Sequence, residues 1–183
     1  MTHSALILVD IQNDYFPSYA GAKMPLPDMD AAAENAAKLL AAARSNGTLV
    51  VHVRHIAAPE TIPFFLPDTP GSETHASVAP QPGETVVQKH AINSFQNTNL
   101  ESMLKEAQIS DVTVCGAMSH VCIDGTVRAA SDMGYAVTVA EDACAAPDVT
   151  YNGVDVPAKQ VHATIMAPLA MAYAQVLSTQ ECL

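Results

Sequence analysis

Three residues of this sequence could together carry out nucleophilic hydrolysis. Asp10 and Lys89 each end a β-rich apolar run, and Cys122 follows another such run across a short turn. A thiolate is a nucleophile, a carboxylate can accept the proton of a thiol, and a nearby ammonium group favours the thiolate electrostatically. These residue types therefore predict a cysteine-based hydrolytic site, provided that the fold brings them together.

The segment around Cys122 predicts a buried strand, a glycine turn and a helix. The run Val112–Cys115 lacks polar alternation, and Gly116 precedes a segment of helical character that ends at Gly134. Cys122 should lie in the first helical turn, where the helix dipole and unpaired N–H groups make a thiol easier to ionise. A buried free cysteine that acts as a small apolar residue is the alternative.

The other two residues also have purely structural interpretations. Asp10 could cap a turn or be a solvated loop acid, although its place beside an apolar run favours a partly buried carboxylate that needs a partner. Lys89 could be a solvated strand end. In an open parallel sheet, the carboxyl ends of the strands share one edge, and functional groups gather there. The three residues would therefore meet if their strands are neighbours.

Alternating strands and helices predict a single three-layer α/β/α domain over residues 1–183, with a mainly parallel, Rossmann-like sheet of about six strands. The expected strands are Ala5–Asp10, Thr48–Arg54, Glu84–Lys89, Val112–Cys115, Tyr135–Ala140 and Gln175–Ser178.

Helices are expected after Asp28, with a stop at Gly47, and after a capping box that runs from Thr98 to Glu101. A last helix should start at Pro157, and Pro168 should kink it or end its regular part. Between strands, Tyr151-Asn152-Gly153-Val154 predicts a small hairpin with a type I′ turn.

The segment Ile56–Gly83 contains six prolines, including Pro59, and should be an ordered loop without regular elements. Its Phe64-Phe65-Leu66 triplet suits a substrate wall and a dimer contact equally well. Whether the loop is a lid, a subunit contact or both stays open.

Charge and composition exclude several classes of protein. A net charge of −11 from scattered acids argues against a nucleic-acid or anionic-membrane partner. The N-terminal apolar run is too short for a signal peptide or a membrane span, so we expect a cytoplasmic protein. The four cysteines include no CxxC pair and support neither a disulfide framework nor a cysteine-rich zinc site.

Three segments resemble the successive signatures of the isochorismatase-like cysteine hydrolases: LILVDIQNDYF, TVVQKHAINSFQNTNL and TVCGAMSHVCIDGTVRAASDMGYAVTVAEDA. The resemblance implies a catalytic triad with Asp10 as general base, Lys89 as its lysine and Cys122 as nucleophile. It also implies a non-proline cis peptide at Ala117–Met118, with the amides of Met118 and Cys122 as oxyanion hole. Ser119 stands where threonine is more usual.

The resemblance further implies a hydrolase of a small amide, carbamoyl or related C–N substrate that works through a thioester, needs no cofactor and forms a homo-oligomer, a dimer or higher. Nicotinamidases of this superfamily bind a metal through an Asp-x-His pair, but here the matching stretch reads Val53-Arg54-His55-Ile56. We therefore expect no metal. His52, His55 and His75 could form another site, although ordinary pocket or surface histidines are the simpler interpretation.

Two other functions remain open on the same fold. Isochorismatase-type enzymes cleave a vinyl ether but lack the cysteine, and a thiol sensor would need Cys122 without the base Asp10. The substrate is not evident from the sequence. The candidates for the pocket wall follow strands at the functional edge or lie beside Cys122: Phe16, His55, Phe64, Asn93 and His120. His120 could instead cap its helix.

Overall fold

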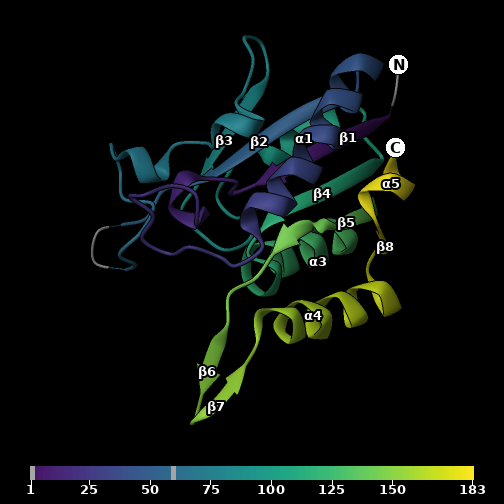
Figure 1. Ribbon diagram of the computed structural model, residues 1–183. Helices are drawn as coiled ribbons and strands as arrows, with labels where there is room; N and C mark the ends of the chain where they lie inside the picture. Colours follow the sequence, from purple (N-terminus) through teal and green to yellow (C-terminus); the bar gives the residue numbers. More distant parts are fainter. Residues whose placement is uncertain (1–2, 59–60) are drawn as a thin grey trace.

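Six parallel strands form the central sheet of the computed structural model, which describes residues 3–58 and 61–183 (Figure 1). Their order across the sheet is β3-β2-β1-β4-β5-β8, which confirms the predicted parallel sheet. The strands span Ser4–Val9 (β1), Leu49–His55 (β2), Thr85–Lys89 (β3), Asp111–Ala117 (β4), Ala136–Ala145 (β5) and Gln175–Leu177 (β8).

Helices cover both faces of this sheet and complete three layers (Figure 1). Helix α1 packs against β1, β2, β4 and β5 on one face, with α5 beside it, while α3 and α4 pack together on the other. The helices span Met29–Asn46 (α1), Leu100–Glu106 (α2), Asp124–Asp132 (α3), Ala158–Ala172 (α4) and Thr179–Cys182 (α5). Within the described residues, no helix combines the length and apolar composition needed to cross a bilayer.

Strand β1 lies inside the sheet because its residues can be buried on both faces, and it pairs with β2 and β4. Val9 stands opposite Gly116 of β4. A Cβ atom at Gly116 would lie 1.9 Å from the carbonyl oxygen of Val9, and the glycine has a φ of +125°. Only glycine fits this position, where the two backbones approach closely beside the functional edge.

Strand β5 is longer than the sequence predicted. The predicted end at Ala140 is wrong, because a bulge carries Glu141 and Asp142 out of the ladder before pairing resumes at Cys144. The Asp142 carboxylate then accepts hydrogen bonds from the N–H and hydroxyl of Thr179 at the start of α5, a helix that the sequence analysis missed.

One local prediction about helices also fails. The capping box at Thr98 does not form: Asn99 precedes α2 without a side-chain cap, and the Thr98 hydroxyl instead donates to Ser94 O. Pro168 does not end α4, which continues to Ala172, so of its two predicted effects only the kink stays a prediction. The hairpin is confirmed, with positive φ at Asn152 and Gly153 between strands β6 (Val149–Tyr151) and β7 (Val154–Val156).

Candidate active site

The three residues singled out in the sequence meet at the carboxyl edge of the sheet. Lys89 Nζ lies 2.8 Å from Asp10 Oδ2 and 3.2 Å from Cys122 Sγ. Asp10 directly follows β1 with a φ of +52°, Lys89 is the last residue of β3, and Cys122 follows β4. Asp10 and Lys89 have no solvent-exposed surface, and Cys122 is 5% exposed. The ion pair of Asp10 and Lys89 is therefore shielded from solvent and lies behind the sulfur of Cys122.

Acceptors surround the Lys89 ammonium group on several sides. Besides Asp10 and Cys122, it contacts the carbonyl oxygens of Ala91 and Ile92 at 3.0 and 3.2 Å and His55 Nδ1 at 3.3 Å. Burial on its own would lower the pKa of Lys89, but the charges and hydrogen bonds of Asp10 and Cys122 raise it above the ordinary lysine value. Lys89 therefore stays an ammonium group.

Cys122 lies in a single π-helical turn, Ser119–Ile123, which precedes α3 and follows the expected cis peptide between Ala117 and Met118. The prediction that this thiol ionises readily is wrong. Burial and the neighbouring carboxylate of Asp10 raise the pKa of Cys122 to about 12, and the opposing effect of Lys89 does not compensate. Before substrate binds, Cys122 is a neutral thiol.

One cluster among the described residues has the spacing of metal ligands. A carboxylate oxygen of Asp10, a ring nitrogen of His55 and Cys122 Sγ lie within 4.8 Å of one another. Lys89 Nζ is within 3.3 Å of all three residues, so a positive charge already stands among them. His52 and His75 lie elsewhere: His52 Nε2 contacts Glu84, and His75 stacks on Phe16.

A cavity of about 440 Å³ opens onto Cys122. His55 and Phe64 line it, as predicted, and Phe65 does so as well. Phe64 and Phe65 thus form a wall of this cavity, one of the two roles that the sequence left open for their triplet. The further apolar wall residues, which sequence reasoning missed, are Tyr15, Ile62, Ala91, Ile92 and Val121.

Three residues predicted for the wall do not line this cavity. Phe16 is fully buried, and its ring stacks on His75 at 3.6 Å, so that its neighbour Tyr15 faces the cavity instead. Asn93 folds back, and its Oδ1 accepts the N–H of Phe95. His120 lies in the same turn as Cys122. Because residues of a helical turn point in different directions, Cys122 lines the cavity and His120 does not.

Two buried polar residues just after β1 hold the wall in place. Gln12 Nε2 donates to His55 O at 2.9 Å, and its Oε1 accepts the N–H of His55 at 2.8 Å. Asp14 Oδ2 accepts the N–H of Phe65 at 2.7 Å. The only sequence signal for these roles is the polar run that follows a buried strand.

Within the predicted loop Ile56–Gly83, residues 59–60 lie outside the described residues, and they include Pro59.

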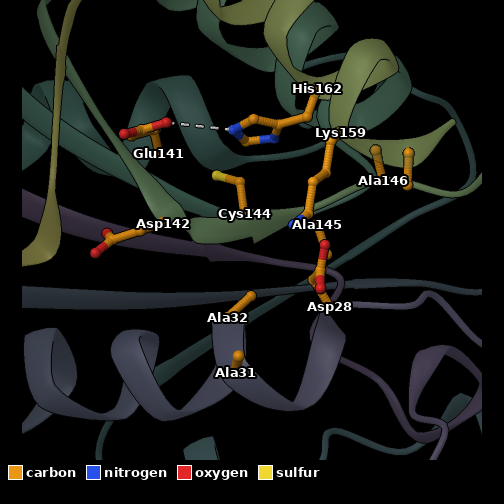
Figure 2. A pocket seen from close by; sticks show the side chains of 11 residues that line it. Asp28, Ala31, Ala32, Glu141, Asp142, Cys144, Ala145, Ala146, Lys159 and His162 are labelled. Carbon is orange, nitrogen blue, oxygen red and sulfur yellow. Dashed lines mark ion pairs between the residues drawn. The ribbon is translucent and has the colours of Figure 1, made fainter.

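Behind the turn of Cys122, a hydrogen-bonded chain joins it to α4. Ser119 is fully buried, and its hydroxyl lies 3.0 Å from Ala145 O and 2.8 Å from His162 Nδ1. The other ring nitrogen of His162 lies 3.5 Å from Glu141 Oε2 (Figure 2). Glu141, Ala145 and His162 border a separate cavity of about 280 Å³ between α1, β5 and α4, which Cys122 does not line. Ser119 therefore anchors the turn of Cys122 to β5 and α4.

The chain is similar to known proteins over almost its whole length. The family model described as "Isochorismatase domain" matches residues 4–181. The isochorismatase family protein YddQ of Bacillus subtilis is 47% identical over 180 residues, which are 98% of each chain. Streptothricin hydrolase of Streptomyces noursei is 36% identical over 145 residues, 79% of this chain and 50% of that protein. A solved structure of the isochorismatase hydrolase type from Oleispira antarctica superimposes with a TM-score of 0.94 at 53% identity, covering 98% of this chain and 95% of that one.

Proposed function

This chain belongs to the isochorismatase family of hydrolases, and from that membership we propose that it cleaves a small amide, carbamoyl or related C–N substrate through a thioester on Cys122. The observation that carries the proposal is the contact of Lys89 with both Asp10 and Cys122, at 2.8 and 3.2 Å, at the end of a cavity of about 440 Å³. A hydrolase name among the relatives, streptothricin hydrolase, supports the reaction class.

The first half of the reaction is attack by sulfur. Asp10, whose carboxylate lies within 4.8 Å of Cys122 Sγ, takes the thiol proton as the sulfur attacks the carbonyl carbon. Lys89 stabilises the thiolate while it exists. Met118 and Cys122 both line the cavity, and we assign their backbone N–H groups to the developing oxyanion. The proton held by Asp10 then passes to the nitrogen as the C–N bond breaks.

The second half is hydrolysis of the thioester. Asp10, again a carboxylate, removes a proton from water as the water oxygen attacks the thioester carbonyl. The C–S bond breaks, and the sulfur recovers its proton from Asp10. The sum of both halves is one amide and one water converted to one carboxylic acid and one ammonia or amine. Every proton transfer uses the same carboxylate, which suits an acid that is paired with a fixed ammonium group.

The alternatives fit these residues less well. A thiol sensor depends on an easily formed thiolate, whereas the pKa of Cys122 is raised to about 12 by burial and by Asp10. Cleavage of a vinyl ether does not need a nucleophile, whereas here a sulfur forms part of the cavity surface. Both observations favour carbonyl chemistry.

The test is ammonia release from a panel of primary amides, carbamoyl compounds and ureido acids. Wild type should release ammonia from at least one compound, and Cys122→Ala should lose at least about 1000-fold in rate. Mass spectrometry of acid-quenched reactions should find the acyl group on Cys122. Equal rates from wild type and Cys122→Ala, or no release from any compound, would overturn the proposed function.

A further inference from the structure

The wall of the cavity at Cys122 is mostly apolar. Tyr15, Phe64 and Phe65 contribute a cluster of rings, with centroids 4.5 to 5.8 Å apart. Ile62, Ile92 and Val121 add aliphatic surface. Such a surface gains free energy by covering apolar substrate atoms and offers nothing to replace the hydration of an ion.

Charged side chains are absent from the described part of this wall. The charged pair Asp10 and Lys89 lies close by, but both residues are fully buried and face each other at 2.8 Å behind Cys122. No arginine, other lysine, aspartate or glutamate lines the cavity in residues 3–58 and 61–183. A carboxylate on the substrate would therefore find no lysine or arginine partner in the described part of the wall.

His55, a histidine of the wall, is held as a neutral ring. Its Nδ1 faces Lys89 Nζ at 3.3 Å and must accept from it, and burial together with the charge of Lys89 lowers the pKa of His55. The ring of His55 therefore supplies no positive charge to the cavity. His90 is exposed, and its Nδ1 lies 2.8 Å from Ile56 O.

We propose that this cavity selects uncharged amides with an apolar acyl group, such as aryl or short alkyl carboxamides, over amides that carry a carboxylate. The inference rests on the proposed function and narrows it. A volume of about 440 Å³ suits a ring or a short alkyl chain, within the range of small-molecule sites. Discrimination comes from the wall, because an unpaired carboxylate placed against it loses its hydration without gaining a partner.

Two matched substrate pairs test this selectivity: hexanamide against 6-amino-6-oxohexanoate, and benzamide against 4-carbamoylbenzoate. Within each pair the amide group is the same, and at the far end a carboxylate replaces a methyl group in the first pair and a ring hydrogen in the second. The uncharged member should have the higher kcat/KM by at least about 100-fold, because burying an unpaired charge is strongly unfavourable. Equal or higher kcat/KM for the carboxylates would overturn the selectivity and leave the proposed function intact.

A designed reversal provides the second test. Ile92 lines the cavity and is 53% exposed, so a long side chain can be accommodated at its mouth. Ile92→Arg should shift the kcat/KM ratio toward the carboxylates by at least about 10-fold, since it supplies the missing cation. Ile92→Met, which adds length without charge, is the matched control and should leave the ratio unchanged. An unchanged ratio in Ile92→Arg would contradict the inference, whereas loss of Cys122-dependent cleavage of every compound would contradict the function itself.

Discussion

The ammonium nitrogen of Lys89 lies 3.2 Å from the sulfur of Cys122, although β3 is an edge strand and β4 is three positions away from it in the sheet. The long side chain reaches past His55 at the end of β2 and Asp10 at the end of β1. The carboxyl ends of four neighbouring strands therefore contribute to one buried arrangement of charges, and changing any of its members should affect the others.

Replacement of Lys89 by methionine should destabilise the protein by about 3–5 kcal/mol, because it leaves the buried carboxylate of Asp10 without a partner. Asp10 Oδ1 has no hydrogen-bond partner among the described residues even with Lys89 in place. The double variant Lys89→Met/Asp10→Asn should recover part of this loss, and Asn suits the positive φ of position 10. Urea unfolding measures both. A single variant that costs less than about 1 kcal/mol would contradict the expected coupling.

Alkylation of Cys122 by iodoacetamide should be slow at neutral pH and should still be rising at pH 10. Burial and the charge of Asp10 raise the pKa of this thiol to about 12, so little thiolate exists near pH 7. The rate at Cys122 can be followed by peptide mass spectrometry, with the urea-unfolded protein as the reference for an ordinary thiol. Asp10→Asn should shift the profile to lower pH. A plateau below pH 8 in the wild type would refute the neutral thiol.

The positions of the three site residues could be predicted because each depends on a local pattern, an apolar run that ends at the functional edge. The ionisation of Cys122 could not be predicted in this way. Its place near a helix start is local, but the burial that raises its pKa depends on the whole fold.

The cavity wall was predicted only in part for a related reason. Tyr15 and Phe16 are adjacent in sequence, yet one lines the cavity and the other stacks on His75. Which ring faces inward depends on hydrogen bonds between distant segments, such as that from Phe65 N–H to Asp14. Single-sequence patterns do not contain such long-range contacts, and the bulge in β5 escaped prediction likewise.

The ion pair between Arg44 of α1 and Glu84, the residue before β3, should make the stability of the protein sensitive to acid. Arg44 donates two hydrogen bonds to Glu84, and these lower the pKa of Glu84 to about 2. A carboxylate with a lowered pKa contributes stability that is present above its unfolded pKa, near 4.5, and is lost as the pH falls toward 2. Glu84→Gln should therefore cost about 1.5–3 kcal/mol at pH 7 and much less at pH 2.5.

The matched control for this variant is Glu101→Gln, which removes an exposed ion pair with Lys105 on α2. It should change the free energy of unfolding by less than about 0.5 kcal/mol at either pH. If the cost of Glu84→Gln were the same at pH 7 and pH 2.5, the ion pair would not be the source of the stability.

Removal of the Ser119 hydroxyl should destabilise the protein by about 1–3 kcal/mol, because Ala145 O and His162 Nδ1 would each lose a buried partner. Thr164→Ala is the comparison, since its exposed hydroxyl bonds only to Val161 O of the same helix, and its cost should stay within about 0.5 kcal/mol. Thermal unfolding of both variants measures the difference. Equal small costs would show that Ser119 does not anchor the turn of Cys122.

The residues proposed to break bonds are buried, whereas the residues that would contact the rest of the substrate come from different parts of the chain. Asp10 and Lys89 have no exposed surface, while Tyr15, Phe64 and Ile92 are contributed by connecting segments. Exchanges among the connecting segments leave the inner ion pair untouched. Substitutions of a few side chains in the connecting segments can therefore change the substrate specificity of such a fold while the buried ion pair stays the same.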